Sequence, residues 1–168
     1  MSVRICTLGI DQFDIKKIRP IKNNPEYINK PIGGLWGSTF LKDLDYRSDW
    51  ERWCVNHDYR LDNLFDCMTY ELNDNAKILE IASYDHFREL MRKYAPIMTS
   101  INGQQYGLNF ERIAEEYDVI HHNGYIFDKF NWNWNDPRLE GWITETYIIM
   151  NLDAINMQSI RYNKEIYK

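Results

Sequence analysis

Strand-like and helix-like segments follow one another along this chain in an irregular order, and this order constrains the fold most. Alternating apolar and polar residues predict a half-buried strand over 3–8. Short apolar runs predict further strands over 35–40, 76–81, 118–122 and 145–151, and one more within 155–168. No regular strand–helix alternation of the kind found in doubly wound sheets connects them, which indicates the α+β class.

Polar residues at the start of three apolar-periodic segments predict helices between these strands. Ser48 and Glu51 form a capping box that predicts a short helix ending near His57. Ser83 and Asn109 predict the N-caps of two more helices, each followed by apolar residues at helical spacing. The 168 residues are enough for one domain, residues 1–168, with a hydrophobic core of its own.

Charge and cysteine content exclude several broad classes. The net charge of −5 disfavours a protein that coats nucleic acid non-specifically. Cys6, Cys54 and Cys67 are odd in number and lack metal-type spacing, so we expect buried, reduced thiols and a cytoplasmic location. No apolar run approaches the roughly 20 residues of a spanning helix, and we expect neither a membrane partner nor a signal peptide.

The glycine-rich segment 30–38 has two possible interpretations. Gly33 and Gly34 allow a backbone to approach a ligand closely, Trp36 offers a flat apolar wall, and Ser38 offers a hydroxyl. The segment can therefore form a nucleotide-binding loop. It can equally form a tight turn that precedes a buried tryptophan.

Two other kinds of site are disfavoured by spacing. His121 and His122 are adjacent on a predicted strand and point to opposite faces, so we expect no shared metal ion, although one of them can face a cleft. The run 34–38 lacks the Gly-x-Ser-x-Gly elbow of a serine hydrolase.

A third constellation resembles a known superfamily. Arg4 on the first strand, the glycine-rich run 33–38 and Glu145 before a late strand follow the order found in ADP-ribosyltransferases. Residues 117–120 are similar to the family's Tyr-Asp-Gly-Val stretch, and residues 145–155 to its Glu-Tyr-Val-Val-Phe-Asp-Pro-x-x-Ile run. Segments 30–38 and 50–54 also resemble those of small phage and mobile-element proteins with a Lys-Pro-x-Gly-Gly-Leu-Trp-x-Ser motif.

The resemblance implies a fold, a substrate and a reaction. The fold is a mixed or antiparallel split β-sheet with short peripheral helices, and the substrate is NAD, with no metal. The bond between nicotinamide and ribose breaks through an oxocarbenium-like transition state, as in glycoside hydrolysis. Glu145 is the implied carboxylate that stabilises the developing positive charge, and Glu140 is its rival in the same connection.

The resemblance also implies roles for the other site residues. Ser38 orients the ribose or supports Glu145, Trp36 stacks on nicotinamide, and Arg4 binds pyrophosphate or ribose oxygens. Gly33 and Gly34 let the backbone approach the dinucleotide. The alternatives are plain structural roles: a surface residue on an edge strand for Arg4, a cap or turn for Ser38, and a strand flank for Glu145.

These implications leave two functions open. One is an NAD-dependent enzyme that modifies a protein or nucleic-acid target, with a bacterial defence or host component as the target in a phage setting. The other is a non-catalytic module that binds a nucleotide or a protein on the same scaffold. Thr7-Leu8-Gly9 stands where many superfamily members have a His-Gly-Thr triplet, which favours the second function.

Overall fold

A computed structural model describes residues 3–26, 30–42, 44–94, 108–124, 142 and 144–166. The strands are β1 (Arg4–Leu8), β2 (Leu35–Thr39), β3 (Cys67–Leu72), β4 (Ile78–Ile81), β5 (Val119–His122), β6 (Thr146–Ile149) and β7 (Ile155–Tyr162). The helices are α1 (Asp49–Asn56), α2 (Tyr84–Lys93), α3 (Phe110–Glu116) and the short α4 (Asn163–Ile166). The predicted α+β class is confirmed, whereas the rival carboxylate Glu140 lies outside the described residues.

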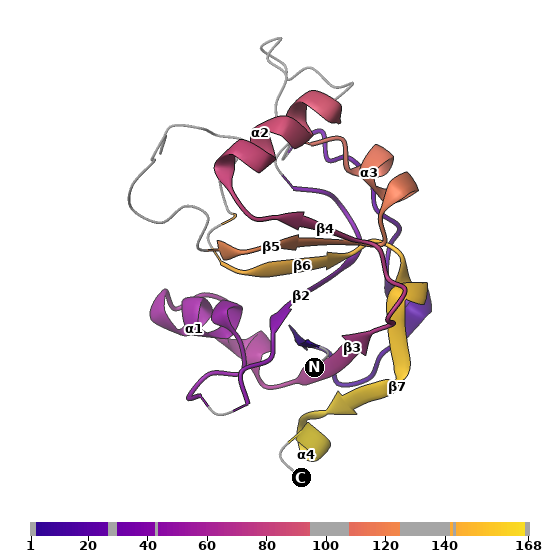
Figure 1. Cartoon of the computed structure of the whole chain (residues 1–168). Coiled ribbons are helices and arrows are strands. Elements are labelled where there is room, and N and C mark those ends of the chain that lie inside the picture. The colour runs from indigo at the N-terminus through magenta and orange to yellow at the C-terminus, as the bar shows by residue number, and fades with distance from the viewer. Residues whose placement is uncertain are drawn as a thin grey trace.

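The strands form one mixed sheet in the order β4-β5-β6-β2-β1-β3-β7. Among the paired strands described, β4 and β5 run parallel and all other neighbours run antiparallel. Figure 1 shows β4, β5 and β6 above, β3 and β7 below, and β2 passing between the two groups. We call these groups the upper half (β4-β5-β6) and the lower half (β1-β3-β7) of the sheet.

Two apolar clusters lie on opposite faces of the upper half. Helices α2 and α3 cover its outer face, where Ile120, Ile148 and Trp36 pack with the helix side chains. The inner face of the upper half shares a second cluster with the lower half, in which Tyr70 and Ile149 are buried. Each such side chain contributes about 1.5–3 kcal/mol through burial, so the clusters hold the two halves and the helices together.

The three predicted N-caps are confirmed. The Oγ atoms of Ser48 and Ser83 accept hydrogen bonds at 3.2 and 3.1 Å from backbone N–H groups three residues ahead, and Asn109 Oδ1 accepts one at 3.1 Å. The reciprocal half of the predicted capping box differs. Glu51 accepts its backbone hydrogen bond from Arg47, at 2.5 Å, because its carboxylate also pairs with the Arg47 guanidinium.

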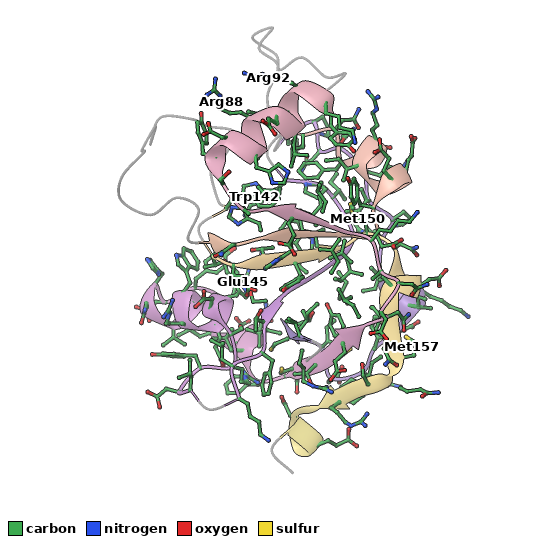
Figure 2. All side chains as sticks on the ribbon, in the orientation of Figure 1. Arg88, Arg92, Trp142, Glu145, Met150 and Met157 are labelled. Carbon is green, nitrogen blue, oxygen red and sulfur yellow. The ribbon has the colours of Figure 1, made fainter. Side chains whose placement is uncertain are left out.

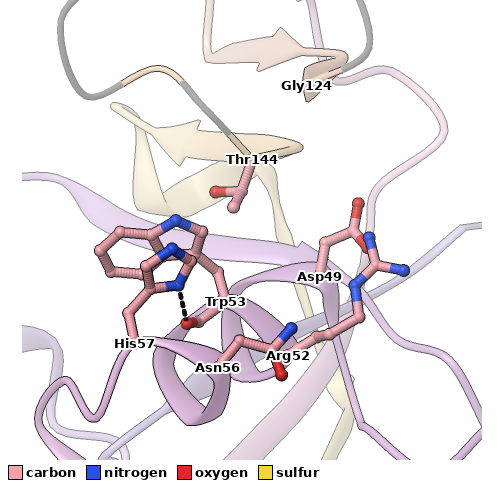
Figure 3. A pocket seen from close by; sticks show the side chains of 7 residues that line it. All are labelled: Asp49, Arg52, Trp53, Asn56, His57, Gly124 and Thr144. Carbon is pink, nitrogen blue, oxygen red and sulfur yellow. Dashed lines mark hydrogen bonds and ion pairs between the residues drawn. The ribbon is translucent and has the colours of Figure 1, made fainter.

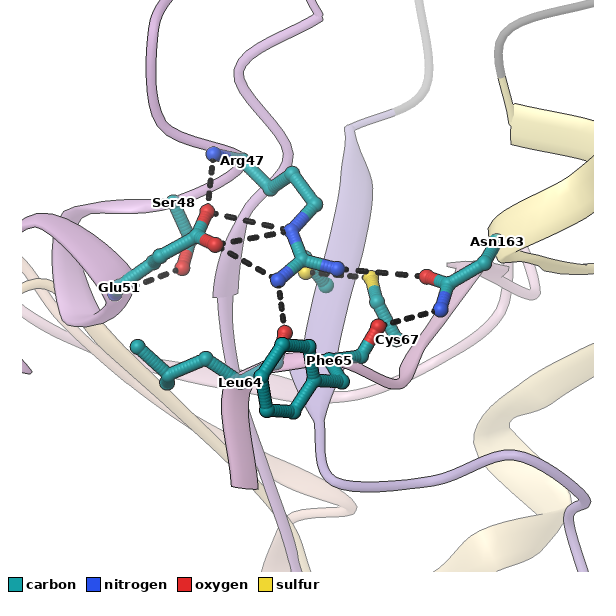
Figure 4. A network of polar contacts seen from close by, with 8 residues as sticks. Arg47, Ser48, Glu51, Leu64, Phe65, Cys67 and Asn163 are labelled. Carbon is teal, nitrogen blue, oxygen red and sulfur yellow. Dashed lines mark hydrogen bonds and ion pairs between the residues drawn. The ribbon is translucent and has the colours of Figure 1, made fainter. Parts of the chain in front are cut away.

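Arg47 ties α1 to the lower half of the sheet (Figure 4). Its guanidinium donates to Glu51 at 2.6 Å, to Asn163 at 3.2 Å and to the carbonyl of Leu64. We call Arg47, Glu51, Asn163 and the nearby Cys67 the Arg47 cluster. It joins the start of α1, the segment before β3 and the C-terminal helix α4.

The three cysteines are buried and free, as predicted. The Sγ atoms of Cys6 and Cys67 lie 3.0 Å apart on the neighbouring strands β1 and β3. None of the helices in the described ranges is long and apolar enough to cross a membrane.

Candidate functional site

A carboxylate directly before β6 is the centre of the candidate site. The Oε2 atom of Glu145 accepts a hydrogen bond from the Thr39 backbone N–H at 2.7 Å, and Oε1 accepts one from the Thr39 hydroxyl at 2.5 Å. Oε1 also lies 3.1 Å from Nε2 of His121. Only 14% of the Glu145 side chain is exposed, so its orientation is fixed by these partners.

His121 connects Glu145 to a second carboxylate. Its Nδ1 lies 2.6 Å from Oε2 of Glu80, and its ring stacks on Tyr147 with centroids 4.0 Å apart. The register pairs Glu80 with His121 and His121 with Tyr147 across three strands, which places these side chains in one row on the inner face. We call Thr39, Glu80, His121 and Glu145 the Glu145 cluster.

Mutual hydrogen bonding favours the charged forms of His121 and Glu145. Burial raises the pKa of Glu145, but hydrogen bonds from His121 and Thr39 outweigh it and hold this pKa below its ordinary value. Burial lowers the pKa of His121, but Glu145 and Glu80 outweigh it and raise this pKa. When His121 is protonated, two carboxylates face one imidazolium, and the Glu145 cluster keeps a net negative charge.

The two histidines lie on opposite faces, as predicted. His122 is 1% exposed on the outer face, where its ring meets Trp142 edge-on at 5.1 Å. Burial lowers its pKa to about 4, so His122 is neutral while His121 favours its charged form. Figure 2 shows Trp142 and Glu145 on opposite sides of the upper half. Within the described ranges, no group of three or more His, Cys, Asp or Glu could hold a metal ion.

Ser38 contacts Glu145 through the backbone. Its hydroxyl donates to the Glu145 carbonyl oxygen at 2.7 Å, and the side chain is almost fully buried. Its neighbour Thr39 contacts the carboxylate instead, and adjacent residues on a strand point to opposite faces. Ser38 therefore fixes the chain at Glu145 from the outer face, which agrees with support for Glu145 and not with direct contact to a ligand on the inner face.

Arg4 is not brought to Glu145. Its guanidinium pairs with Glu71 at 2.8 Å, and it donates to the Thr69 hydroxyl at 3.2 Å and to the Ser159 carbonyl at 2.9 Å. These partners lie on β3 and β7. The alternative of an edge-strand residue is also wrong, because β1 lies between β2 and β3 inside the sheet.

The glycine-rich segment forms a tight turn. Gly33 and Gly34 have φ of +82° and +69°, and a Cβ on Gly33 would stand 2.2 Å from the Pro20 carbonyl oxygen. The space beside Gly33 is therefore filled by the chain itself. Trp36 donates its indole N–H to the Gly33 carbonyl at 2.9 Å and packs on the outer face with Ile148.

The expected grouping of Gly33, Gly34 and Trp36 with Glu145 around one dinucleotide is thus corrected. Trp36 and Ile148 are register partners on the outer face, whereas the Glu145 carboxylate meets His121 on the inner face. The close backbone approach that glycine permits is made here within the chain, to the Arg19 and Pro20 carbonyls at Gly33 and to the Ile149 carbonyl at Gly34.

Sequence reasoning missed Thr39, Glu80 and Tyr147 and left His121 unassigned. A signal was present in the alternation of the strands, since Glu80 and His121 occupy inner-face positions of predicted strands and Thr39 follows Ser38. The register that aligns these strands depends on distant parts of the chain. Scans against protein-family models and searches of curated proteins and solved structures found no match to this chain.

Proposed function

We propose that this protein is an NAD-dependent ADP-ribosyltransferase-like enzyme that modifies a protein or nucleic-acid target, with Glu145 as its catalytic carboxylate. One observation carries the proposal. Glu145 is a mostly buried carboxylate whose two oxygens are held by Thr39 and His121, so its negative charge is fixed in place. The split-sheet superfamily fold is part of the proposal, and the position of β2 between the upper and lower halves of the mixed sheet supports it.

In the proposed reaction, the fixed negative charge of Glu145 lies beside the positive charge that develops on the ribose. The C1′–nitrogen bond of NAD breaks, nicotinamide leaves with the bonding electron pair, and positive charge builds on the ribose. A preorganised carboxylate stabilises this charge without reorganisation. Thr39 and His121 position Glu145, and Ser38 holds its backbone. The acceptor then bonds to C1′ and loses a proton to solvent.

Arg4, Gly33, Gly34 and Trp36 have no direct role in this proposal. Arg4 is paired with Glu71, and the glycine turn and Trp36 make contacts within the fold. The groups that bind the pyrophosphate are not among these four residues.

The test compares Glu145→Gln with Glu115→Gln, a matched change at an exposed glutamate on α3. Both variants and the wild type are incubated with labelled NAD, with and without a bacterial lysate, and label transfer and nicotinamide release are measured. We expect Glu145→Gln to lose about 10²–10³-fold in rate, the size typical of a lost electrostatic stabiliser, and Glu115→Gln to match the wild type. Wild-type protein that neither transfers label nor releases nicotinamide would sink the proposal.

A second function is a non-catalytic nucleotide- or protein-binding module. The internal pairing of Arg4 favours it, because the arginine expected to meet the dinucleotide is already bound to Glu71 and Thr69. The two functions differ in a simple measurement. A module that binds NAD raises its melting temperature with added NAD, yet leaves the NAD intact after long incubation.

A further inference from the structure

Helix α1 and the ends of β5 and β6 border an open cleft of about 440 Å³, a volume in the range of small-molecule sites. The cleft is lined by Asp49, Arg52, Trp53 and Asn56 from α1, by its C-cap His57, by Gly124 after β5, and by Thr144 before Glu145. Figure 3 shows the α1 side chains and the Thr144 side chain around this space. One lining residue, Thr144, directly precedes the proposed catalytic Glu145 in the chain, and Glu145 itself is not among the lining residues.

The sequence of α1 makes one helix face into a wall of the cleft. Its lining residues are separated by three, one, three and one positions, which is the spacing of a single face of an α-helix. The buried Cys54 and the Glu51–Arg47 pair belong to the side that packs on the sheet. The cleft face of α1 is thus left for contacts other than the core.

The aromatic lining residues Trp53 and His57 belong to a stack of rings. Trp53 lies between Trp50, with ring centroids 5.1 Å apart and planes at 7°, and His57, at 4.4 Å and 18°. Tyr59 meets Trp53 edge-on at 5.5 Å. Because Trp50 and His57 cover the two faces of the Trp53 indole, His57 is the lining ring that can offer a face to a flat ligand. Base–aromatic stacking contributes about 1–3 kcal/mol per base.

The polar part of the wall offers donors and acceptors without net charge. Asp49 and Arg52 form an ion pair at 2.8 Å and neutralise each other. His57 donates from Nδ1 to the Trp53 carbonyl at 2.8 Å, so Nε2 is its other ring nitrogen for a hydrogen bond to a ligand. Asn56 brings an amide that both donates and accepts. A neutral, planar ring with a hydrogen-bonding edge fits this set better than a phosphate or a lone cation does.

We propose that this cleft binds the nucleobase of the acceptor, so that the enzyme modifies a nucleoside or nucleotide. The acceptor role rests on the proposed function, because transfer requires a donor at Glu145. A ring or exocyclic nitrogen of the base forms a bond to C1′ as the bond to nicotinamide breaks. Nicotinamide leaves with the electron pair, and the proton of the attacking nitrogen passes to solvent.

Binding is tested first and without NAD. Adenosine, guanosine, cytidine, uridine and thymidine are titrated separately into wild-type protein and into Asn56→Ala, His57→Ala and the control Val55→Ala, a residue of α1 outside the cleft lining. Tryptophan fluorescence reports binding because Trp53 lines the site. We expect at least one nucleoside to bind, about tenfold more weakly to each cleft variant, consistent with a lost hydrogen bond of about 1.4 kcal/mol, and unchanged to Val55→Ala. No binding of any nucleoside at millimolar concentration overturns the inference, whatever the activity toward NAD.

Transfer is tested second, with NAD and the nucleoside that binds. Mass spectrometry detects the ADP-ribosylated nucleoside, and we expect Asn56→Ala to lower its formation about tenfold, while the control Val55→Ala matches wild type in product formation and in nicotinamide release. Modification of proteins alone, or NAD binding that weakens in Asn56→Ala as much as nucleoside binding does, overturns the inference. If wild-type protein binds a nucleoside but never consumes NAD, the proposed function fails and the nucleobase site remains.

Discussion

The Arg47 cluster and the Glu145 cluster both bury a carboxylate beside a cation, yet their surroundings differ. Arg47 is held by α1, by a carbonyl before β3 and by α4, and only 15% of its side chain is exposed (Figure 4). The Glu145 cluster lies on the inner face and ends at Glu80, which is 54% exposed. A guanidinium stays charged at any pH a protein meets, whereas an imidazole between carboxylates changes charge.

This difference separates a structural tie from a candidate site. In the Arg47 cluster, three elements depend on one permanent charge. Next to Arg47, the thiols of Cys6 and Cys67 share a hydrogen bond. This hydrogen bond and burial raise the pKa of Cys6. The same hydrogen bond and the nearby Arg47 charge lower the pKa of Cys67. In the Glu145 cluster, hydrogen bonds fix one titratable carboxylate near a cleft. Buried polar contacts alone therefore do not mark function, and the presence of a group that can change its charge is more informative.

The largest expected effect is on stability, from Arg47→Met. Removing the guanidinium leaves the mostly buried Glu51 carboxylate without its charge partner, and breaking such a pair costs about 3–5 kcal/mol. Urea unfolding followed by circular dichroism measures the loss. Glu145→Gln should lose only about 1–2 kcal/mol, because its amide keeps an oxygen that accepts from Thr39.

The matched control is Arg88→Met on α2. Arg88 is 49% exposed and its ion-pair distance to Asp85 is 3.7 Å, so we expect a change of about 0–0.5 kcal/mol. If Arg47→Met were as mild as this control, Arg47 would not be a structural tie and the comparison between the two clusters would be lost.

The second effect is a pH-dependent contribution to stability, which we expect from the Glu145 cluster and not from the Arg47 guanidinium. The folded-state pKa of His121 is raised, so its contribution to stability is fully present below the unfolded value of 6.5 and is lost as pH rises through the folded pKa. The folded-state pKa of Glu145 is lowered, so its contribution is present above 4.5 and is lost as pH falls through the folded pKa. His121→Gln should therefore destabilise the protein at pH 5.5 and much less at pH 9.

Urea midpoints of wild type and His121→Gln across this pH range measure the effect. Arg47→Met should instead show a difference from wild type that is nearly constant between pH 5.5 and pH 9, since arginine does not titrate there. A His121→Gln difference that grows with rising pH would contradict the assigned charge state.

The third effect is a difference between the titration midpoints of the adjacent His121 and His122, measured by NMR on their ring Cε1 protons. His121 should titrate above 6.5 because Glu145 and Glu80 stabilise its charged form, and His122 at about 4 because it is buried. Two midpoints near 6.5 would show that neither environment is as the structure describes.

Local signals in the sequence predicted the helices, while the site depended on pairing between distant segments. Ser48, Ser83 and Asn109 act as N-caps within three residues, so the chain nearby is enough to identify them. The partnership of Thr39 with Glu145 spans 106 residues and arises only when β2 pairs with β6. The sequence near Thr39 or near Glu145 does not predict which residues of β2 and β6 pair.

The glycine-rich segment 30–38 also shows that local sequence does not identify distant contacts. Its composition allows close approach of a backbone, but composition does not say which backbone approaches. At Gly33 the neighbour is the chain itself at Pro20, and at Gly37 a Cβ would stand 2.8 Å from the Cys6 carbonyl of the adjacent strand. Ser38 contacts the Glu145 backbone carbonyl, while the Ser38 and Glu145 side chains lie on opposite faces of the sheet.

The smallest expected effect is from Glu80→Gln at the exposed end of the Glu145 cluster. Solvent screens this half-exposed carboxylate, so its loss should change the free energy of unfolding by less than about 1 kcal/mol. It should nevertheless lower the pKa of His121, because one of the two carboxylates that favour the imidazolium is gone. The NMR titration of His121 in this variant gives the shift, and raising the salt concentration in wild-type protein should move the midpoint in the same direction. If the titration midpoint of His121 does not move, Glu145 alone stabilises the imidazolium. The exposed Glu80 would then have no influence on the Glu145 cluster, and the contrast with the Arg47 cluster would be lost.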